Sequence, residues 1–249
     1  MKVFGLTRIR NEELIIQDTL DHMDTFCDGI IVYDDSSTDS TLDICKKHKS
    51  VIKIIENKNW SEDRLTAEYA SRQELFLEAK RHLGEDDWFV YMDADERIVC
   101  DSLREMMRNA DVIAMKLFDV YITEDDKDKE YWERNMVGIE YRIIPMAYRM
   151  SVAKGWKNRN QRECLYDPAK SWVAISGYVK HYGKAISVDE WESTCDYYIK
   201  YFSKYSDKWA KRKGKAIHDK SDFGTPLMKW EEVMNTKEYN LKLLESYVR

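Results

Sequence analysis

Residues 88–96 read WFVYMDADE, in which an apolar run passes directly into three carboxylates. Trp88 to Met92 are aromatic or aliphatic, and such a run is typical of a strand inside a sheet. Side chains two residues apart on an extended strand lie on the same side, so Asp93 and Asp95 are expected to converge at its end. Two carboxylates that close destabilise each other unless a positive group joins them. The stretch therefore predicts a buried strand that ends at a cation-binding site.

The residues before this stretch alternate between strand-like runs and segments with helical periodicity. Asn11 is the expected N-cap of the first helix. Leu65, Tyr69, Phe76 and Leu77 are the expected buried positions of a helix over 63–82. The expected strands cover residues 2–6, 29–33, 51–55 and 88–92. This alternation predicts an α/β fold, with a mostly parallel central sheet flanked by helices on both faces.

Polar clusters follow three of the expected strands. They read TRIRNEE, DDSSTD and DADE, and ligands of parallel sheets bind beyond the carboxyl ends of the strands. The glycine-rich patterns of dinucleotide and P-loop sites are absent from the sequence. An acidic site still accepts a nucleoside diphosphate if Mg²⁺ or Mn²⁺ joins carboxylates to the phosphates. We therefore expect a nucleotide site that contains a divalent metal.

Composition excludes several other classes of protein. The formal net charge of −6 gives no general attraction to nucleic acid, and no apolar run approaches the length of a membrane span. The first residues are too soon acidic for a signal peptide. The five cysteines are scattered and form no C-x-x-C pair, which favours free thiols in a reducing cytosol. A cytoplasmic protein is expected.

The four motifs together resemble family 2 glycosyltransferases with the GT-A fold. TRIRNEE, IIVYDDSSTDST, an Arg-bearing helix and WFVYMDADER occur in the order and spacing of the subgroup that adds sugars to lipopolysaccharide cores. The likeness covers about the first hundred residues. Departures are Ser36, where the family often has glycine, and WSEDRLTAEY at 60–69, where it has a glycine-rich approach to the helix. They affect the expected shape of the donor pocket, not the reaction class.

The resemblance implies roles for the matching residues. Asp34 and Asp35 would lie beside the donor nucleoside, with Thr7, Arg8 and Asn11 forming another part of that pocket. Arg72 would contact the pyrophosphate side. Asp93 and Asp95 would be the D-x-D pair that holds Mn²⁺ or Mg²⁺, with Asp95 the direct ligand, and His181 would lie near the metal.

The implied reaction is an inverting transfer from a nucleoside-diphosphate sugar, with UDP favoured, to a glycan, glycolipid or glycoprotein hydroxyl. Such a hydroxyl needs a general base within hydrogen-bond reach. Glu163 resembles an acidic position of the subgroup and is the expected base, with Asp119 and Asp167 as alternatives. We expect a single domain with a donor half (1–97), an acceptor half (98–225) and a C-terminal helix (226–249).

Other classes of function stay open at the level of sequence. A sugar-phosphate nucleotidyltransferase would need a glycine-rich, basic loop after the first strand. A non-catalytic nucleotide-sugar or glycan-binding module would keep the fold without turnover, and a glycosidase would need neither nucleotide nor metal. The aromatic and basic segment DYYIKYFSKYSDKWAKRKGK, at 196–215, allows a peripheral contact with an anionic membrane at its inner face.

Overall fold

The computed structural model describes residues 1–157 and 162–235. The chain divides into two compact units, the first of residues 1–116 and 143–179, the second of 117–142 and 180–249. All of the expected donor half lies in the first unit, whereas the expected acceptor half is divided between both. Three strands have residues in both units: β6 (Val112–Val120), β7 (Met136–Arg149) and β8 (Val173–His181).

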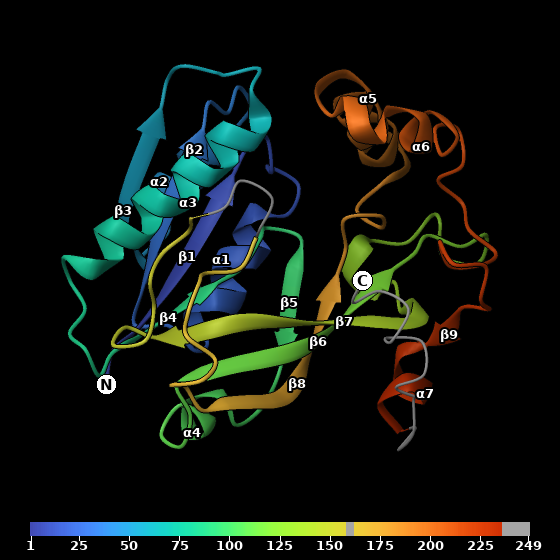
Figure 1. Ribbon diagram of the computed structural model, residues 1–249. Coiled ribbons are helices and arrows are strands. Elements are labelled where there is room, and N and C mark those ends of the chain that lie inside the picture. The colour runs from blue at the N-terminus through green and yellow to red at the C-terminus, as the bar shows by residue number, and fades with distance from the viewer. Residues whose placement is uncertain (158–161, 236–249) are drawn as a thin grey trace. The chain divides into compact units, whose positions relative to one another are not determined.

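The first unit is built on alternating strands and helices (Figure 1). In order they are β1 (Val3–Ile9), α1 (Ile16–Asp24), β2 (Gly29–Asp35), α2 (Thr41–Lys47), β3 (Val51–Asn57), α3 (Arg64–Lys80), β4 (Trp88–Tyr91), β5 (Glu96–Val99) and α4 (Leu103–Met106). The strand order of the sheet is β3-β2-β1-β4-β7-β6-β8-β5. Pairings are parallel from β3 to β4, and β4 pairs with β7 antiparallel. The α/β class predicted from the sequence is confirmed. The sheet contains both parallel and antiparallel pairings.

Strand β1 is buried on both faces because helices cover each of them. Phe4 and Leu6 pack in the same apolar cluster as Phe76 of α3. Gly5 points the other way, since successive side chains of a strand alternate. A Cβ at Gly5 would collide with Met23 of α1, so the glycine permits close packing of that helix on the sheet. The helices cover the two faces of the sheet and not the carboxyl ends of its strands.

Two local expectations about helices are wrong. Asn11 does not cap α1, which begins at Ile16 without a side-chain cap, and Asn11 instead has a left-handed φ of 54°. In α3, Phe76 is buried as predicted, but Leu65 and Leu77 are 40% and 47% exposed. Asp63 caps α3, where its carboxylate accepts a hydrogen bond from the Thr66 backbone N–H at 3.1 Å. The buried face of α3 is therefore set by its contacts with the sheet.

The second unit contains the C-terminal helices that the sequence predicted. Its elements outside the shared strands are η1 (Tyr131–Glu133), α5 (Val188–Tyr201), η2 (Ser203–Tyr205), α6 (Ser206–Ala210), β9 (Met228–Lys229) and α7 (Trp230–Asn235). Trp191, Cys195 and Ala216 form its small core, against which Trp209 packs. The expected helix over 226–249 is described only as far as α7, and residues 236–249 lie outside the described residues.

Two expectations about cysteines and membrane spans can be compared with the structure directly. All five cysteines are free thiols, as predicted. Among the described residues, no helix combines the length and apolarity that crossing a bilayer requires.

Candidate functional site

The loops that follow β1 and β2 are joined by reciprocal hydrogen bonds. The Asn11 backbone N–H donates to the Ser37 hydroxyl at 3.1 Å, and the Asn11 side-chain carbonyl accepts from the Thr38 N–H at 2.8 Å. Glu13 likewise accepts from the Ser40 N–H at 3.0 Å. These bonds hold Asn11 in its left-handed backbone conformation. Asparagine tolerates that conformation better than most residues do. Asn11 thus orders the rim of the site.

Asp35 is the centre of a buried charge cluster at the end of β2. It is 1% exposed, and its carboxylate accepts from Arg8 at 3.0 Å, from the Asn57 amide at 3.0 Å and from Arg64. Burial alone would raise the pKa of Asp35, but the charges of Arg8 and Arg64 hold it below its ordinary value. The carboxylate is therefore ionised, and it fixes two guanidinium groups at this edge.

Three charged residues recur at a spacing of four along α3. Arg64, Glu68 and Arg72 therefore lie on one face of the helix. Glu68 approaches Arg8 at 3.9 Å and Arg72 at 3.6 Å, which links the Asp35 cluster to the residues around β4. Sequence reasoning selected Arg72 but missed Arg64 and Glu68, although the four-residue spacing was readable. Their shared face is what brings the two clusters together.

Trp60 adds an aromatic surface to this cluster. The guanidinium carbons of Arg10 and Arg64 lie 3.2 and 3.7 Å from the centre of its ring. Arginine on an aromatic face is a favourable cation–π arrangement. Trp60 thus places one aromatic ring against two arginines at this edge of the sheet.

A second hydrogen-bonded series runs from α3 to the D-x-D stretch. Arg72 Nε donates to the Tyr91 hydroxyl at 3.1 Å, and that hydroxyl donates to Asp93 at 3.0 Å. Arg162 Nε donates to the other oxygen of Asp93 at 2.9 Å and also binds Glu96 through Nη2. Burial opposes ionisation of Asp93, but Arg162 and Arg72 hold its pKa well below the ordinary value. The cation that Asp93 has in this structure is Arg162, which the sequence did not predict.

Asp34 and Thr7 are buried at the same edge with unsatisfied polar atoms. Asp34 is 3% exposed, and one of its oxygens accepts a hydrogen bond from the Ser37 backbone N–H at 3.3 Å. Its other oxygen and the Thr7 hydroxyl have no hydrogen-bond partner among the described residues. Burial raises the pKa of Asp34. Asp34 and Asp35 point to opposite faces of β2 because neighbours on a strand alternate.

Ser36, in the turn after β2, has an unusual backbone conformation for a residue with a side chain. Its φ is 63°, in the left-handed region that favours glycine. The Ser36 hydroxyl donates to the Asn57 carbonyl at 2.7 Å, which holds the turn in that conformation. This bond ties the turn after β2 to the end of β3.

Asp93 and Asp95, the two carboxylates expected to hold a divalent metal, are both half-buried at the end of β4. Both oxygens of Asp93 accept hydrogen bonds. In residues 1–157 and 162–235, no three His, Cys, Asp or Glu side chains are arranged to hold a metal ion. Mg²⁺ and Mn²⁺ often bind one or two carboxylates together with substrate phosphates. A metal at these carboxylates would therefore need further ligands from a bound phosphate.

His181 lies in the second unit, at the end of β8 and not in a loop. Its Nδ1 is 2.6 Å from Asp119, and Lys184 Nζ donates to the other Asp119 oxygen at 2.6 Å. Burial opposes ionisation of Asp119, but Lys184 and His181 hold its pKa well below the ordinary value. Lys184 also contacts Asp222 at 2.6 Å. Asp119 is an alternative general base in the sequence analysis. In the structure, its two oxygens are bound to His181 and Lys184.

Glu163 and Asp167 lie in the first unit, beyond Arg162. Glu163 is half-buried, and its charge adds to the effect of burial in raising the pKa of Tyr166. Asp167 accepts from the Ala169 N–H at 3.1 Å and lies 3.8 Å from Lys170, as expected of a residue that orders a turn. The environment thus favours Glu163 over Asp167 as a chemically available carboxylate.

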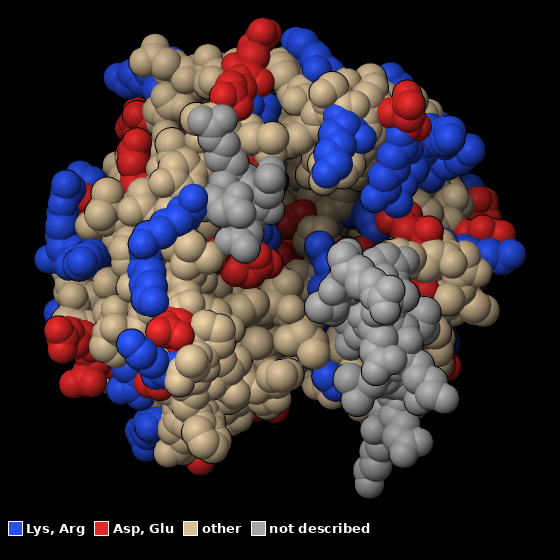
Figure 2. All heavy atoms as spheres, viewed as in Figure 1, with Lys and Arg blue, Asp and Glu red and all other residues tan. Residues whose placement is uncertain are grey.

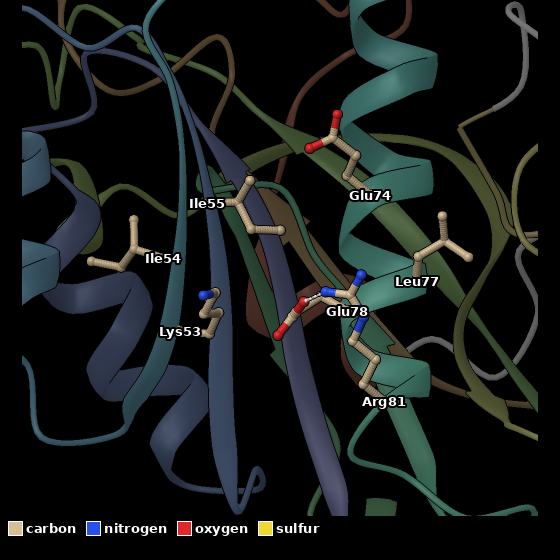
Figure 3. A pocket seen from close by; sticks show the side chains of 7 residues that line it. All are labelled: Lys53, Ile54, Ile55, Glu74, Leu77, Glu78 and Arg81. Carbon is tan, nitrogen blue, oxygen red and sulfur yellow. Dashed lines mark hydrogen bonds and ion pairs between the residues drawn. The ribbon is translucent and has the colours of Figure 1, made fainter.

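A surface hollow between β3 and α3 contains none of the predicted site residues. Figure 3 shows charged side chains from both elements along it, with Glu78 paired to Arg81. The full lining is Lys53, Ile54, Ile55, Glu74, Leu77, Glu78 and Arg81. Its carboxylates and cations neutralise each other, so the hollow has no chemistry in common with the cluster at the strand ends.

Comparisons with known proteins gave matches to solved structures only. No family model matches the chain, and no curated protein sequence matches it. The first 349 residues of S. aureus TarS, in complex with UDP, are 14% identical over 85% of this chain and 71% of that one, with a TM-score of 0.46. Glucosyl-3-phosphoglycerate synthase from Mycobacterium tuberculosis, with Mn²⁺, UDP and glucosyl-3-phosphoglycerate, is 14% identical. That match covers 47% of this chain and 44% of the synthase, with a TM-score of 0.31.

A structure of 4-diphosphocytidyl-2C-methyl-D-erythritol synthase is also similar. It is 12% identical over 60% of this chain and 76% of that one, with a TM-score of 0.38. The chain spans less than half of the mycobacterial synthase. At these identities the likeness concerns the fold alone.

Proposed function

We propose that this protein is an inverting, metal-dependent glycosyltransferase of family 2, with the GT-A fold and of the lipopolysaccharide-core type. It transfers a sugar, in the hexosyltransferase class, from a nucleoside-diphosphate sugar to a hydroxyl of a glycan, glycolipid or glycoprotein. UDP is the proposed nucleotide and Mn²⁺ or Mg²⁺ the proposed cofactor. The main support is the convergence of Arg8, Arg72 and Asp93 at the carboxyl ends of parallel strands. Guanidinium groups bind phosphates and carboxylates bind divalent metals.

Each residue has a defined part in the proposed reaction. Asp95 would hold the metal, which, when bound, stabilises the charge that grows on the leaving nucleoside diphosphate. Arg72, fixed by the Tyr91 hydroxyl, would orient the phosphates. Glu163 would take the proton of the acceptor hydroxyl as its oxygen bonds to the anomeric carbon from the face opposite the breaking bond. That geometry inverts the configuration of the sugar.

His181 is proposed as a metal-binding residue. A carboxylate on one ring nitrogen is the arrangement found around metal-binding histidines, where the other nitrogen is the ligand. Asp119 provides that carboxylate at 2.6 Å. Asp34, Asp35 and Thr7 are proposed to form the nucleoside side of the pocket, and the buried unsatisfied oxygens of Asp34 and Thr7 are groups that a ligand would satisfy.

The alternatives have less support. A nucleotidyltransferase loop would be glycine-rich, but residues 10–15, between β1 and α1, contain no glycine. A non-catalytic binding module would bind a nucleotide sugar without turning it over. Turnover therefore separates that class from the proposed enzyme.

Calorimetric titration of UDP, GDP, dTDP and CDP, with and without Mn²⁺, tests the donor site. Of the four nucleotides, we expect only UDP to bind. Its binding should require Mn²⁺, because a metal at Asp95 needs the phosphates as further ligands. Asp95→Ala is expected to remove this metal-dependent binding, whereas Asp101→Ala, an exposed carboxylate beyond β5, should retain it. Absence of binding for all four nucleotides, with or without metal, contradicts the proposal. UDP-sugar binding without transfer to any acceptor favours the binding module.

We also propose that the second unit contacts an anionic membrane surface peripherally. Residues 200–220 contain eight Lys or Arg and only two Asp, although the whole chain has a net charge of −6. Lys208 and Lys211 are exposed, and Figure 2 shows Lys and Arg side chains gathered over the region of α6. Each such cation near an anionic membrane contributes about 1 kcal/mol.

Co-sedimentation with vesicles measures this contact. Phosphatidylglycerol vesicles are expected to retain the protein at low salt, and phosphatidylcholine vesicles are not. Lys208→Glu/Lys211→Glu should weaken binding by about tenfold or more. The control, Lys58→Glu/Lys80→Glu, makes the same charge change at exposed sites in the first unit and should bind like the wild type. Equal sedimentation with both vesicle types contradicts the proposal.

A further inference from the structure

Arg162 is held in place by its own backbone and by neighbouring aromatic residues. Its carbonyl accepts a hydrogen bond from the Trp156 indole N–H at 2.6 Å. Two residues later, the Cys164 N–H donates to the Tyr148 hydroxyl at 3.1 Å. Trp156 and Tyr148 are 1% and 0% exposed, so these anchors belong to the core. The Arg162 side chain can therefore change its partners while the backbone stays in position.

The Arg162 guanidinium joins the two carboxylates that flank the D-x-D turn. Nε donates to Asp93 at 2.9 Å, and Nη2 binds Glu96, whose side chain is 2% exposed. The same Glu96 carboxylate accepts from the Asp93 backbone N–H at 3.0 Å. Arg162 thus neutralises two carboxylates, and its position is the one that a cation bound to Asp93 would take.

We infer that Arg162 is a built-in counterion of the D-x-D site, which competes with a divalent metal for Asp93 until a diphosphate arrives. The inference rests on the proposed function and adds an order of binding to it. A metal ion and a guanidinium beside one carboxylate repel each other. The negative charge of a diphosphate offsets the added positive charge, and a guanidinium released from Asp93 is a planar donor suited to phosphate oxygens. Metal and nucleotide therefore bind strongly only together.

The variant that tests this inference must not leave a buried charge behind. Arg162→Met alone would strand the Glu96 carboxylate, which is costly in a buried site. Arg162→Met/Glu96→Gln removes the counterion and its buried partner together, and glutamine keeps an acceptor for the Asp93 N–H. The matched control is Arg149→Met/Asp111→Asn, which removes another ion pair of the first unit, with a separation of 3.2 Å. Thermal unfolding of both variants confirms that each is folded.

Mn²⁺ binding without nucleotide, followed by electron paramagnetic resonance, is the decisive measurement. The wild type and the Arg149 control are expected to bind Mn²⁺ weakly, and Arg162→Met/Glu96→Gln tighter by on the order of tenfold or more. Adding UDP should strengthen Mn²⁺ binding in the wild type more than in this variant. Equal Mn²⁺ affinity in the three proteins, while the wild type still binds UDP with Mn²⁺, overturns the inference but leaves the proposed function intact. Failure of the wild type to bind UDP with Mn²⁺ contradicts the proposed function itself.

Discussion

Asp35→Ala is expected to lower the free energy of unfolding by about 3–5 kcal/mol, because it leaves buried cations without their carboxylate. Arg64 is 1% exposed and lies against Asp35, and the side chain of Arg8 is 16% exposed. Neither guanidinium can regain full hydration without moving out of the core. Urea denaturation followed by circular dichroism measures the change.

The matched control for this prediction is Asp86→Ala. Asp86 also pairs with an arginine, Arg149, at 3.4 Å, but its side chain is 94% exposed. Exposed ion pairs contribute less than about 1 kcal/mol, so this control should unfold almost like the wild type. If Asp35→Ala costs no more than Asp86→Ala, the Asp35 cluster does not hold the edge of the sheet together. The double variant Asp35→Asn/Arg64→Met should be less destabilised than Asp35→Ala, since it removes one buried cation as well.

The parallel part of the sheet could be predicted because its signals are local and periodic. Apolar strands separated by amphipathic segments placed Arg8, Asp35 and Asp93 at the carboxyl ends of parallel strands, and only the directions of the strands were needed for that step. Arg72 was selected through the family resemblance, and the structure brings it together with the other three. The four-residue period of a helix would have added Arg64 to the cluster.

The parts that could not be predicted depend on contacts between distant residues. Asparagine is a common helix cap, but hydrogen bonds from Asn11 to residues 26 and 27 positions later hold its backbone in another conformation. Arg162 meets Asp93 and Glu96 across 69 and 66 residues, and no local pattern marks that pairing. The sequence predicted a cation between Asp93 and Asp95, whereas Arg162 joins Asp93 to Glu96. His181 and Asp119 meet for the same reason, through the ends of β8 and β6.

Glu163→Gln is expected to reduce sugar transfer by about 10²–10⁴-fold while leaving UDP binding unchanged. Glutamine has nearly the same shape as glutamate but cannot accept the proton of an acceptor hydroxyl. The donor groups, Arg72 and Asp95, are separate residues and keep their contacts. Transfer from a UDP-sugar, measured as UDP release in the presence of acceptor, gives the rate, and calorimetry gives the affinity for UDP with Mn²⁺.

Two carboxylate variants decide where the base lies if the expectation fails. Asp167→Asn should retain transfer, because Asp167 orders a turn through the Ala169 N–H. The second variant, Asp119→Asn, should weaken the contacts of residue 119 with His181 and Lys184. Normal transfer by Glu163→Gln together with a large loss in Asp119→Asn would move the proton acceptor to the Asp119–His181 pair of the second unit. Loss of transfer in Glu163→Gln alone, with UDP affinity intact, assigns the base to Glu163, since only a group acting on the acceptor separates binding from turnover.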